Sequence, residues 1–164
     1  MKHLKTIAII GAAEPEAAGA LKFLLNSECH LLLLAQDQTE LRRISKILKN
    51  EKPVAGISLI DCIKEGCWEA DAVVIAVPEA GEKEIAMRIR EVVTQKIVIS
   101  MKIADTIPGN SLQQLLPNSK VVAAKAGKEK GGEWNLIISG GNEAALNAAD
   151  ELLNSLNIRH SVAA

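Results

Sequence analysis

Residues 5–20, KTIAIIGAAEPEAAGA, constrain the fold more than any other stretch of the sequence. A short apolar run with several isoleucines ends at Gly11, and a helix-forming segment follows the turn. Such a run is typical of a strand buried on both faces of a parallel sheet. The segment therefore predicts the strand, the turn and the first helix of a βαβ unit.

The turn departs from the glycine-rich pattern of dinucleotide-binding βαβ units. In G-x-G-x-x-G/A, the glycines allow a tight turn and let backbone N–H groups approach a pyrophosphate. The sequence keeps Gly11 but has Ala13 at the second position and Glu16 at the third. In a loop that is one residue longer, Glu14 and Ala17 occupy these positions. We therefore expect a dinucleotide-binding scaffold with an altered phosphate loop.

A carboxylate in this loop opposes pyrophosphate binding. Two like charges ~4 Å apart at an effective dielectric constant near 20 repel by roughly 4 kcal/mol. That energy corresponds to about a thousandfold in affinity if the Glu14 side chain cannot turn away. In the alternative, Glu14 is a solvated residue near the positive end of the helix, where acids are favoured.

Composition narrows the classes of function. The 164 residues are 48% apolar and carry a net charge of −1, which predicts a single domain over residues 1–164 with a substantial core. This charge gives no electrostatic basis for a nucleic-acid partner, and no apolar run approaches the ~20 residues that cross a membrane. The three cysteines suit reduced thiols in a cytoplasmic protein, and their spacing does not predict a metal site.

Apolar runs and amphipathic segments alternate along the chain, which predicts a doubly wound, mostly parallel sheet in a three-layer αβα, Rossmann-like fold. We predict strands at 7–10, 31–35, 54–60, 72–77, 96–100, 121–124, 135–139 and 158–162. We predict helices at 16–26, 39–50, 82–93, 111–116 and 143–156, a mixed loop or short helix at 61–70, a turn at Pro108 and Gly109, and a flexible basic loop at 125–132.

Four stretches carry a resemblance to a known family: ADAVVIAVP (70–78), KIVIS (96–100), LLPNSKVVAA (115–124) and the last 26 residues from SGGNEAAL onward. In this order they resemble the NADP-binding domain of coenzyme F420-dependent NADP reductases, over about residues 5–162. The resemblance implies NADP or NAD as cofactor and hydride transfer to a flavin-like or small-molecule acceptor. It also implies that residues 76–78 line the path from adenosine to nicotinamide and that Ser100 faces the nicotinamide.

The segment after the second predicted strand departs from this family. NADP-binding relatives place an arginine there for the 2′-phosphate, whereas NAD enzymes use Asp or Glu for the ribose hydroxyls. The sequence offers Gln36, which could bond a ribose hydroxyl or be a polar turn residue, and Asp37, which would repel a 2′-phosphate. The sequence also lacks the C-terminal helical segment of the reductases, so a second redox partner would bind at the open sheet edge or come from another subunit, as in a homodimer.

The candidate cofactor-binding residues follow the carboxyl ends of predicted strands, where ligands bind open α/β sheets. They are Gly11, Ala12, Ala13, Glu14, Gln36, Ala76, Val77, Pro78 and Ser100. Hydride transfer between two cofactors asks little of side chains, and we assign no catalytic residue. Lys102, which also follows the carboxyl end of a predicted strand, is the one cation there that could take part in a reaction, with a solvated loop lysine as the alternative. Lys125 and Lys128 could hold an anionic tail of a substrate or be surface residues.

Two other functions are compatible with the sequence. One is a catalytically inactive, degenerate Rossmann module that serves in ligand sensing or assembly, which the altered loop favours. The other is a CoA-binding-like domain, because IAIIGAAEPEAAGALKFLL loosely resembles the opening segment of that family.

Overall fold

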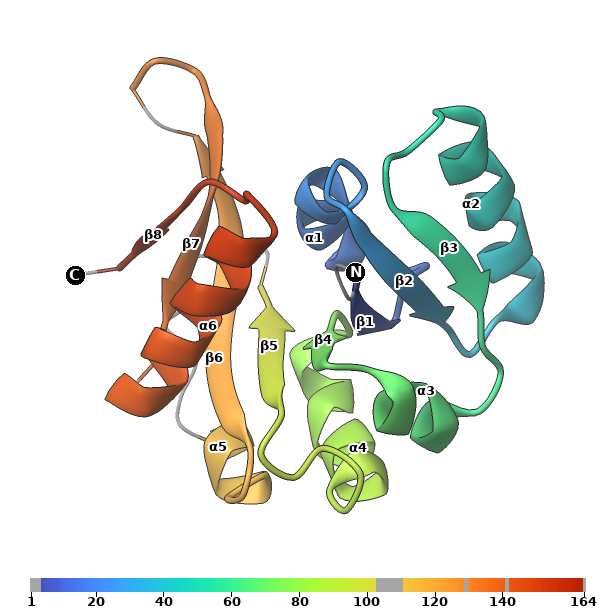
Figure 1. Ribbon diagram of the computed structural model, residues 1–164. Coiled ribbons are helices and arrows are strands. Elements are labelled where there is room, and N and C mark those ends of the chain that lie inside the picture. The colour runs from blue at the N-terminus through green and yellow to red at the C-terminus, as the bar shows by residue number, and fades with distance from the viewer. Residues whose placement is uncertain (1–3, 103–110, 129, 141, 164) are drawn as a thin grey trace.

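Within the described residues, eight strands form one sheet in the order β3-β2-β1-β4-β5-β6-β7-β8 (Figure 1). The computed structural model describes residues 4–102, 111–128, 130–140 and 142–163. The strands are β1 (Lys5–Ile10), β2 (Cys29–Leu34), β3 (Gly56–Leu59), β4 (Ala72–Ile75), β5 (Ile97–Met101), β6 (Lys120–Lys128), β7 (Trp134–Ser139) and β8 (His160–Val162). The helices are α1 (Ala17–Leu24), α2 (Gln38–Asn50), α3 (Ile63–Glu69), α4 (Glu79–Ile89), α5 (Ser111–Leu115) and α6 (Glu143–Ser155).

The order of the first six strands, 3-2-1-4-5-6, is that of the doubly wound dinucleotide-binding fold. Strands β1 to β6 pair in parallel, so their carboxyl ends share one edge of the sheet. The predicted α/β, Rossmann-like architecture is confirmed.

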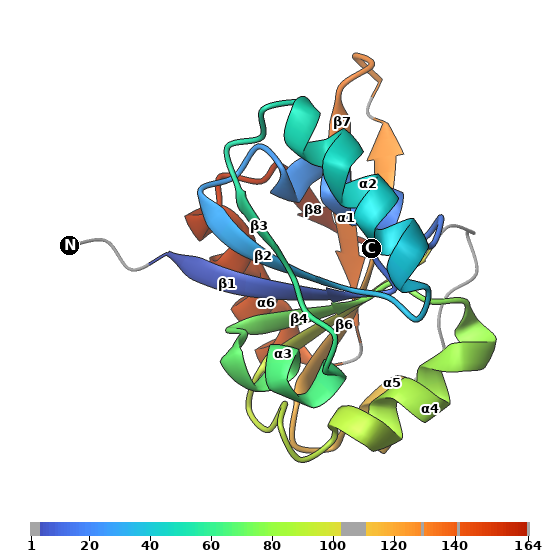
Figure 2. The ribbon, with the colours of Figure 1, turned by 90° about the vertical axis from the view of Figure 1, so that its right-hand side faces the viewer.

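Helices cover both faces of the sheet and create two apolar cores. One core contains α1, Leu41 of α2 and α6, and the other contains residues of α3, α4 and α5. Figure 2 shows α1 and α2 on one side of the sheet, with α3, α4 and α5 on the opposite side. Successive strand residues alternate between the cores, as Ile9 and Ile10 do, because side chains alternate across a strand.

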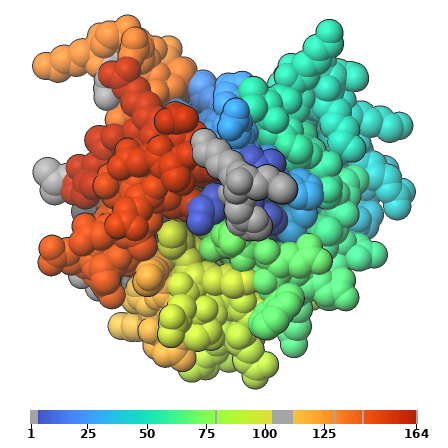
Figure 3. All heavy atoms as spheres, in the orientation of Figure 1, coloured from blue at the N-terminus to red at the C-terminus, as the bar shows by residue number. Residues whose placement is uncertain are grey.

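The prediction of a flexible loop at residues 125–132 is wrong for the first half of that segment. Residues 125–128 continue β6 and pair antiparallel with β7, with Lys128 opposite Trp134. The resulting hairpin projects from the body of the molecule (Figures 1 and 3). Lysine and glycine made the segment look like a loop, but pairing with the apolar β7 overrides local preference. A side chain at Gly127 would meet Ile137 Cδ1 at 2.6 Å.

Other predicted boundaries moved by a few residues. The helix predicted at 82–93 begins at Glu79 and ends at Ile89, with Pro78 at its N-cap. The ambiguous segment 61–70 contains α3. The predicted turn at Pro108 and Gly109 lies outside the described residues.

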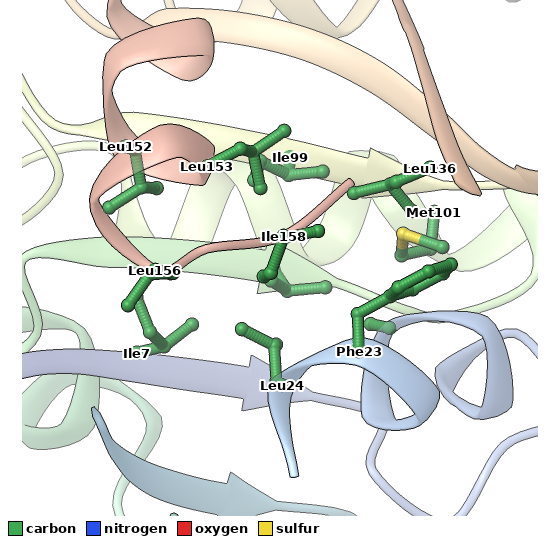
Figure 4. A pocket seen from close by; sticks show the side chains of 12 residues that line it. Ile7, Phe23, Leu24, Ile99, Met101, Leu136, Leu152, Leu153, Leu156 and Ile158 are labelled. Carbon is green, nitrogen blue, oxygen red and sulfur yellow. The ribbon is translucent and has the colours of Figure 1, made fainter. Parts of the chain in front are cut away.

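A small cavity lies between α1, α6 and the sheet (Figure 4). Its volume is about 20 Å³, room for about one water molecule, but its walls are apolar. Ile7, Phe23 and Leu156 are among the side chains that converge on it in Figure 4. It is a packing defect and offers no polar group to a ligand.

None of the described helices combines the length and the apolar character needed to span a bilayer.

Candidate functional site

The candidate site lies at the carboxyl edge of the sheet, where the connections from β1 and β4 diverge. The β1 connection leads to α1 on one face, and the β4 connection leads to α4 on the other. Because β1 and β4 are neighbours, this place is the topological switch point, where open α/β sheets bind their ligands in a crevice.

Gly11 closes the floor of this crevice. Its φ angle is +86°, and a Cβ there would lie 2.4 Å from the Ala76 carbonyl oxygen and 2.7 Å from Val77 Cγ1. Only glycine fits both the backbone conformation and the contact. The structure thus brings the candidate residue Gly11 against two others, Ala76 and Val77, that lie 65 and 66 positions further along the sequence. Pro78 is exposed beside them, whereas Ala76 is fully buried.

Most backbone donors of the loop at residues 11–17 are already bonded. The N–H groups of Gly11 and Ala12 both donate to the Leu34 carbonyl, at 2.8 and 2.9 Å. The Glu14 N–H donates to the Gly11 carbonyl at 2.8 Å. Pro15 has no N–H. Within this loop, the N–H groups of Ala13 and Glu16 have no intramolecular acceptor, which leaves two donors without a bond.

Two carboxylates accompany these donors, and their environments differ. Glu14 is exposed, as expected for a solvated loop residue. Glu16 is partly buried, and its Oε2 is enclosed without a hydrogen-bond partner. An enclosed carboxylate oxygen without a donor is destabilising. Glu16 is therefore the carboxylate of this loop that is held within the protein, whereas Glu14 lies in solvent.

The end of β2 lies beside the same loop. Asp37 caps α2, because its Oδ1 accepts from the Glu40 N–H at 3.1 Å. Arg43 forms an ion pair with Glu40. The hydrogen bond that the Arg43 guanidinium donates holds the pKa of the Glu40 carboxyl below its ordinary value. Gln36 is exposed and has no bond to another described side chain, so its amide is free to meet a ligand.

A buried polar cluster lies at the β5 side of the crevice. Ser100 Oγ donates to Glu82 Oε1 at 2.8 Å, and Lys102 Nζ forms an ion pair with the same oxygen. Ser100 is 3% exposed and Glu82 is 7% exposed. We call Glu82, Ser100 and Lys102 the acid–lysine cluster. A buried ion pair adds little to stability on average, so it invites a functional explanation.

Sequence reasoning selected Ser100 and Lys102 but missed Glu82. The signal was present in the periodicity of α4. Glu82, Ala86 and Ile89 recur at helical spacing and are all buried, so the carboxylate belongs to the apolar stripe of the helix.

The β6–β7 hairpin places a second group of cations near α1. The Trp134 ring lies 3.5 Å from Lys22 Nζ and 5.2 Å from Lys128 Nζ. The ring therefore makes cation–π contacts with two lysines of its own chain. Lys125, at the base of the hairpin, is partly buried.

The described histidines lie away from the crevice. His30 Nε2 bonds Ser58 Oγ at 2.7 Å near the amino ends of β2 and β3. His160 Nε2 bonds Asp150 Oδ1 at 2.6 Å, on the edge strand β8. Across the described part of the chain, no three potential metal ligands gather in one place.

Comparison with known proteins yields structural neighbours only. No family model matches the sequence, and no curated protein matches it significantly. The fold superimposes on 5-formyl-3-hydroxy-2-methylpyridine 4-carboxylic acid 5-dehydrogenase, an NAD⁺-dependent dismutase, with a TM-score of 0.71 and 18% identity; the match covers 98% of this chain and 57% of that one. It also matches a pyrroline-5-carboxylate reductase from Coxiella burnetii, with a TM-score of 0.69, 14% identity and coverage of 99% and 60%.

A third neighbour is the Plasmodium falciparum pyrroline carboxylate reductase, solved with NADP bound. The TM-score is 0.63 and the identity 15%, with coverage of 100% and 59%. The chain thus spans less than two thirds of the length of these neighbours. Likeness at these identities establishes a Rossmann-like fold, and the function must be argued from the site.

Proposed function

We propose that this chain is an NAD(P)-binding oxidoreductase domain that presents a nicotinamide for hydride transfer to a flavin-like ring or a small-molecule acceptor. The observation that carries the proposal is the contact of Gly11 with Ala76 and Val77 at the switch point. A doubly wound sheet binds dinucleotides at this crevice, and the missing Cβ lets the chain turn tightly there.

The described residues provide some of the contacts that such a cofactor needs. The open N–H groups of Ala13 and Glu16 would hold the pyrophosphate, with the N-terminal end of α1 behind them. Gln36 would meet the adenosine ribose. The enclosed Glu16 oxygen weakens this site but does not remove its donors. The bound nicotinamide supplies the hydride chemistry, and the chain supplies orientation.

The structural neighbours agree with this class of cofactor, since they include an NAD⁺-dependent enzyme and a reductase with NADP bound. Within the class, the sequence resemblance favours the F420-dependent reductase type. Cys29, Cys62 and Cys67 are free thiols, which suits the cytoplasmic location that we propose.

Fluorescence tests the proposal directly. Trp134 lies on the hairpin beside α1, so bound NADH or NADPH should quench its emission and show sensitised nicotinamide fluorescence. Trp68, on α3, provides the matched control. Trp134→Phe should remove most of the energy transfer and Trp68→Phe should remove little. Absence of binding by both nucleotides at millimolar concentration would refute the proposal.

One observation favours a second candidate, an inactive Rossmann module for sensing or assembly. The enclosed, unpartnered oxygen of Glu16 belongs to the β1–α1 loop, which binds phosphate in dinucleotide-binding proteins of this fold. This candidate predicts self-association or partner binding without nucleotide binding. Parallel titration with NADH, NADPH and CoA, with sedimentation to follow association, separates it from the oxidoreductase and from a CoA-binding-like domain.

A further inference from the structure

The acid–lysine cluster has hydrogen-bonding capacity that the protein does not use. Glu82 Oε1 accepts both from Ser100 and from Lys102, while no described residue donates to Oε2. Among the described residues, Glu16 Oε2 is the one side-chain atom that is both enclosed and unpartnered. Glu82 Oε2 is not such an enclosed atom, and the Glu82 side chain is 9% exposed.

Lys102 offers the complementary group. Its ammonium carries three N–H donors, and the bond to Glu82 uses one of them. Its side chain is 14% exposed, and its Nζ lies beside the Glu82 carboxylate. The cluster therefore presents one open acceptor and open donors side by side, with little net charge.

The position of the cluster in the fold indicates which part of a dinucleotide it would contact. In a doubly wound sheet the two halves of a dinucleotide bind over the two halves of the sheet, with the pyrophosphate at the first βα turn. The turn after β1 separates β2 and β3 on one side from β4, β5 and β6 on the other. Ser100 and Lys102 come from the end of β5, and Glu82 comes from α4, which follows β4. The cluster thus lies over the half that receives the second nucleoside.

We propose that the acid–lysine cluster recognises the carboxamide of a nicotinamide. Glu82 Oε2 accepts a hydrogen bond from the amide NH₂, and Lys102 donates to the amide oxygen. Ser100 acts through Glu82 by fixing the orientation of the carboxylate. This inference rests on the proposed function, because it assigns a role towards the same cofactor.

The pairing predicts discrimination between an amide and an acid. In nicotinic acid adenine dinucleotide a carboxylate replaces the carboxamide, so Glu82 would face a like charge and lose its donor. Sites built around a buried hydrogen bond reject the analogue that lacks it. We expect the protein to bind NAD⁺ at least about tenfold more tightly than nicotinic acid adenine dinucleotide.

Isothermal titration calorimetry with three ligands tests the inference without any assay of turnover. The ligands are NAD⁺, nicotinic acid adenine dinucleotide and ADP-ribose, which lacks the ring. We expect Glu82→Gln to narrow or reverse the preference for NAD⁺ over the acid, because glutamine can donate to a carboxylate. Lys102→Met should weaken NAD⁺ binding and leave ADP-ribose binding unchanged.

Matched controls come from the exposed face of the same helix. Glu84→Gln and Lys83→Met remove the same charges at exposed positions of α4 and should leave all three affinities unchanged. Circular dichroism verifies that each variant is folded, and the three-ligand series on the unaltered protein decides the main point even if a variant does not fold.

The outcomes separate the two proposals. If none of the three ligands binds, both the proposed function and this inference fail. If all three bind with equal affinity, the protein is a dinucleotide-binding domain but the cluster does not read the carboxamide. Unchanged discrimination in Glu82→Gln would likewise overturn the assignment.

Discussion

At the scale of single residues, Gly11 is the position where backbone geometry and the candidate site depend on each other. Gly11→Ala would place a Cβ 2.4 Å from the Ala76 carbonyl oxygen at a φ angle of +86°. We expect the free energy of unfolding to fall by roughly 1–3 kcal/mol, measured by urea denaturation. Gly131→Ala is the control, because nothing lies within 4 Å of its added Cβ. Equal losses in both variants would mean that the contact is not a constraint.

Replacing the charge of Glu16 should raise both the stability of the protein and its affinity for a dinucleotide. Its enclosed Oε2 lacks a donor, and an uncharged amide costs less to enclose without a partner than a carboxylate does. We expect Glu16→Gln to raise NADH affinity by about tenfold or more, since removal of one like charge near the pyrophosphate relieves repulsion. Glu14→Gln, at an exposed position of the same loop, should have a smaller effect. A larger effect of Glu14→Gln than of Glu16→Gln would mean that Glu14, and not Glu16, repels the pyrophosphate.

At the scale of elements, α6 depends on its N-cap. Asn142 Oδ1 accepts from the N–H groups of Ala144 and Ala145, at 2.9 and 3.3 Å. Asn142→Ala should lower the free energy of unfolding by about 1 kcal/mol, because the first-turn donors lose their acceptor. Asn147→Ala, at an exposed position within α6, should raise it by a few tenths to about 0.7 kcal/mol through helix propensity. Thermal or urea unfolding of both variants gives the comparison.

Among the structural elements, those with local signals could be predicted from the sequence, and those that depend on tertiary pairing could not. The turn at Gly11 was predictable because an apolar strand, a glycine and a helix are local signals. The extension of β6 through Lys128 was not, because a lysine- and glycine-rich segment forms a strand only through its pairing with β7. The bond between Ser100 and Glu82 was not predicted either. It joins residues 18 positions apart, and it depends on how α4 is rotated on the sheet.

At the scale of the whole molecule, the two cores respond to alkaline pH through buried thiols. Burial raises the pKa of Cys29 in one core to about 11 and the pKa of Cys67 in the other to about 12, from an ordinary value of 9.0. Above pH 9 the unfolded chain loses these protons while the native chain keeps them. The native state then binds more protons, so stability falls as pH rises, by up to about 1.4 kcal/mol per pH unit for each thiol.

This decline is measurable as the difference in unfolding free energy between pH 8 and pH 10.5. We expect Cys29→Ala or Cys67→Ala to make the decline shallower, and Cys62→Ala, at a partly buried position, to change it less. Lys96 acts in the opposite direction, because desolvation lowers its pKa and its proton is lost more readily in the native state. Its contribution cancels in the comparison with Cys29→Ala, but not in Cys67→Ala, because the charge of the Cys67 thiolate raises the pKa of Lys96. An unchanged slope in both core variants would contradict the assignment.

One of the two cores contains a small cavity, which makes a difference in packing between the cores testable. Val74 lines the cavity of about 20 Å³ between α1, α6 and the sheet, whereas Val98 is fully buried in the opposite core. An added methylene fills space in the first case and forces neighbours apart in the second. Val74→Ile should therefore be neutral or raise the unfolding free energy by up to about 1 kcal/mol, whereas Val98→Ile should lower it by about 1–3 kcal/mol. Chemical denaturation of the pair checks this, and equal losses would mean that the α1–α6 side is as tightly packed as the α4 side.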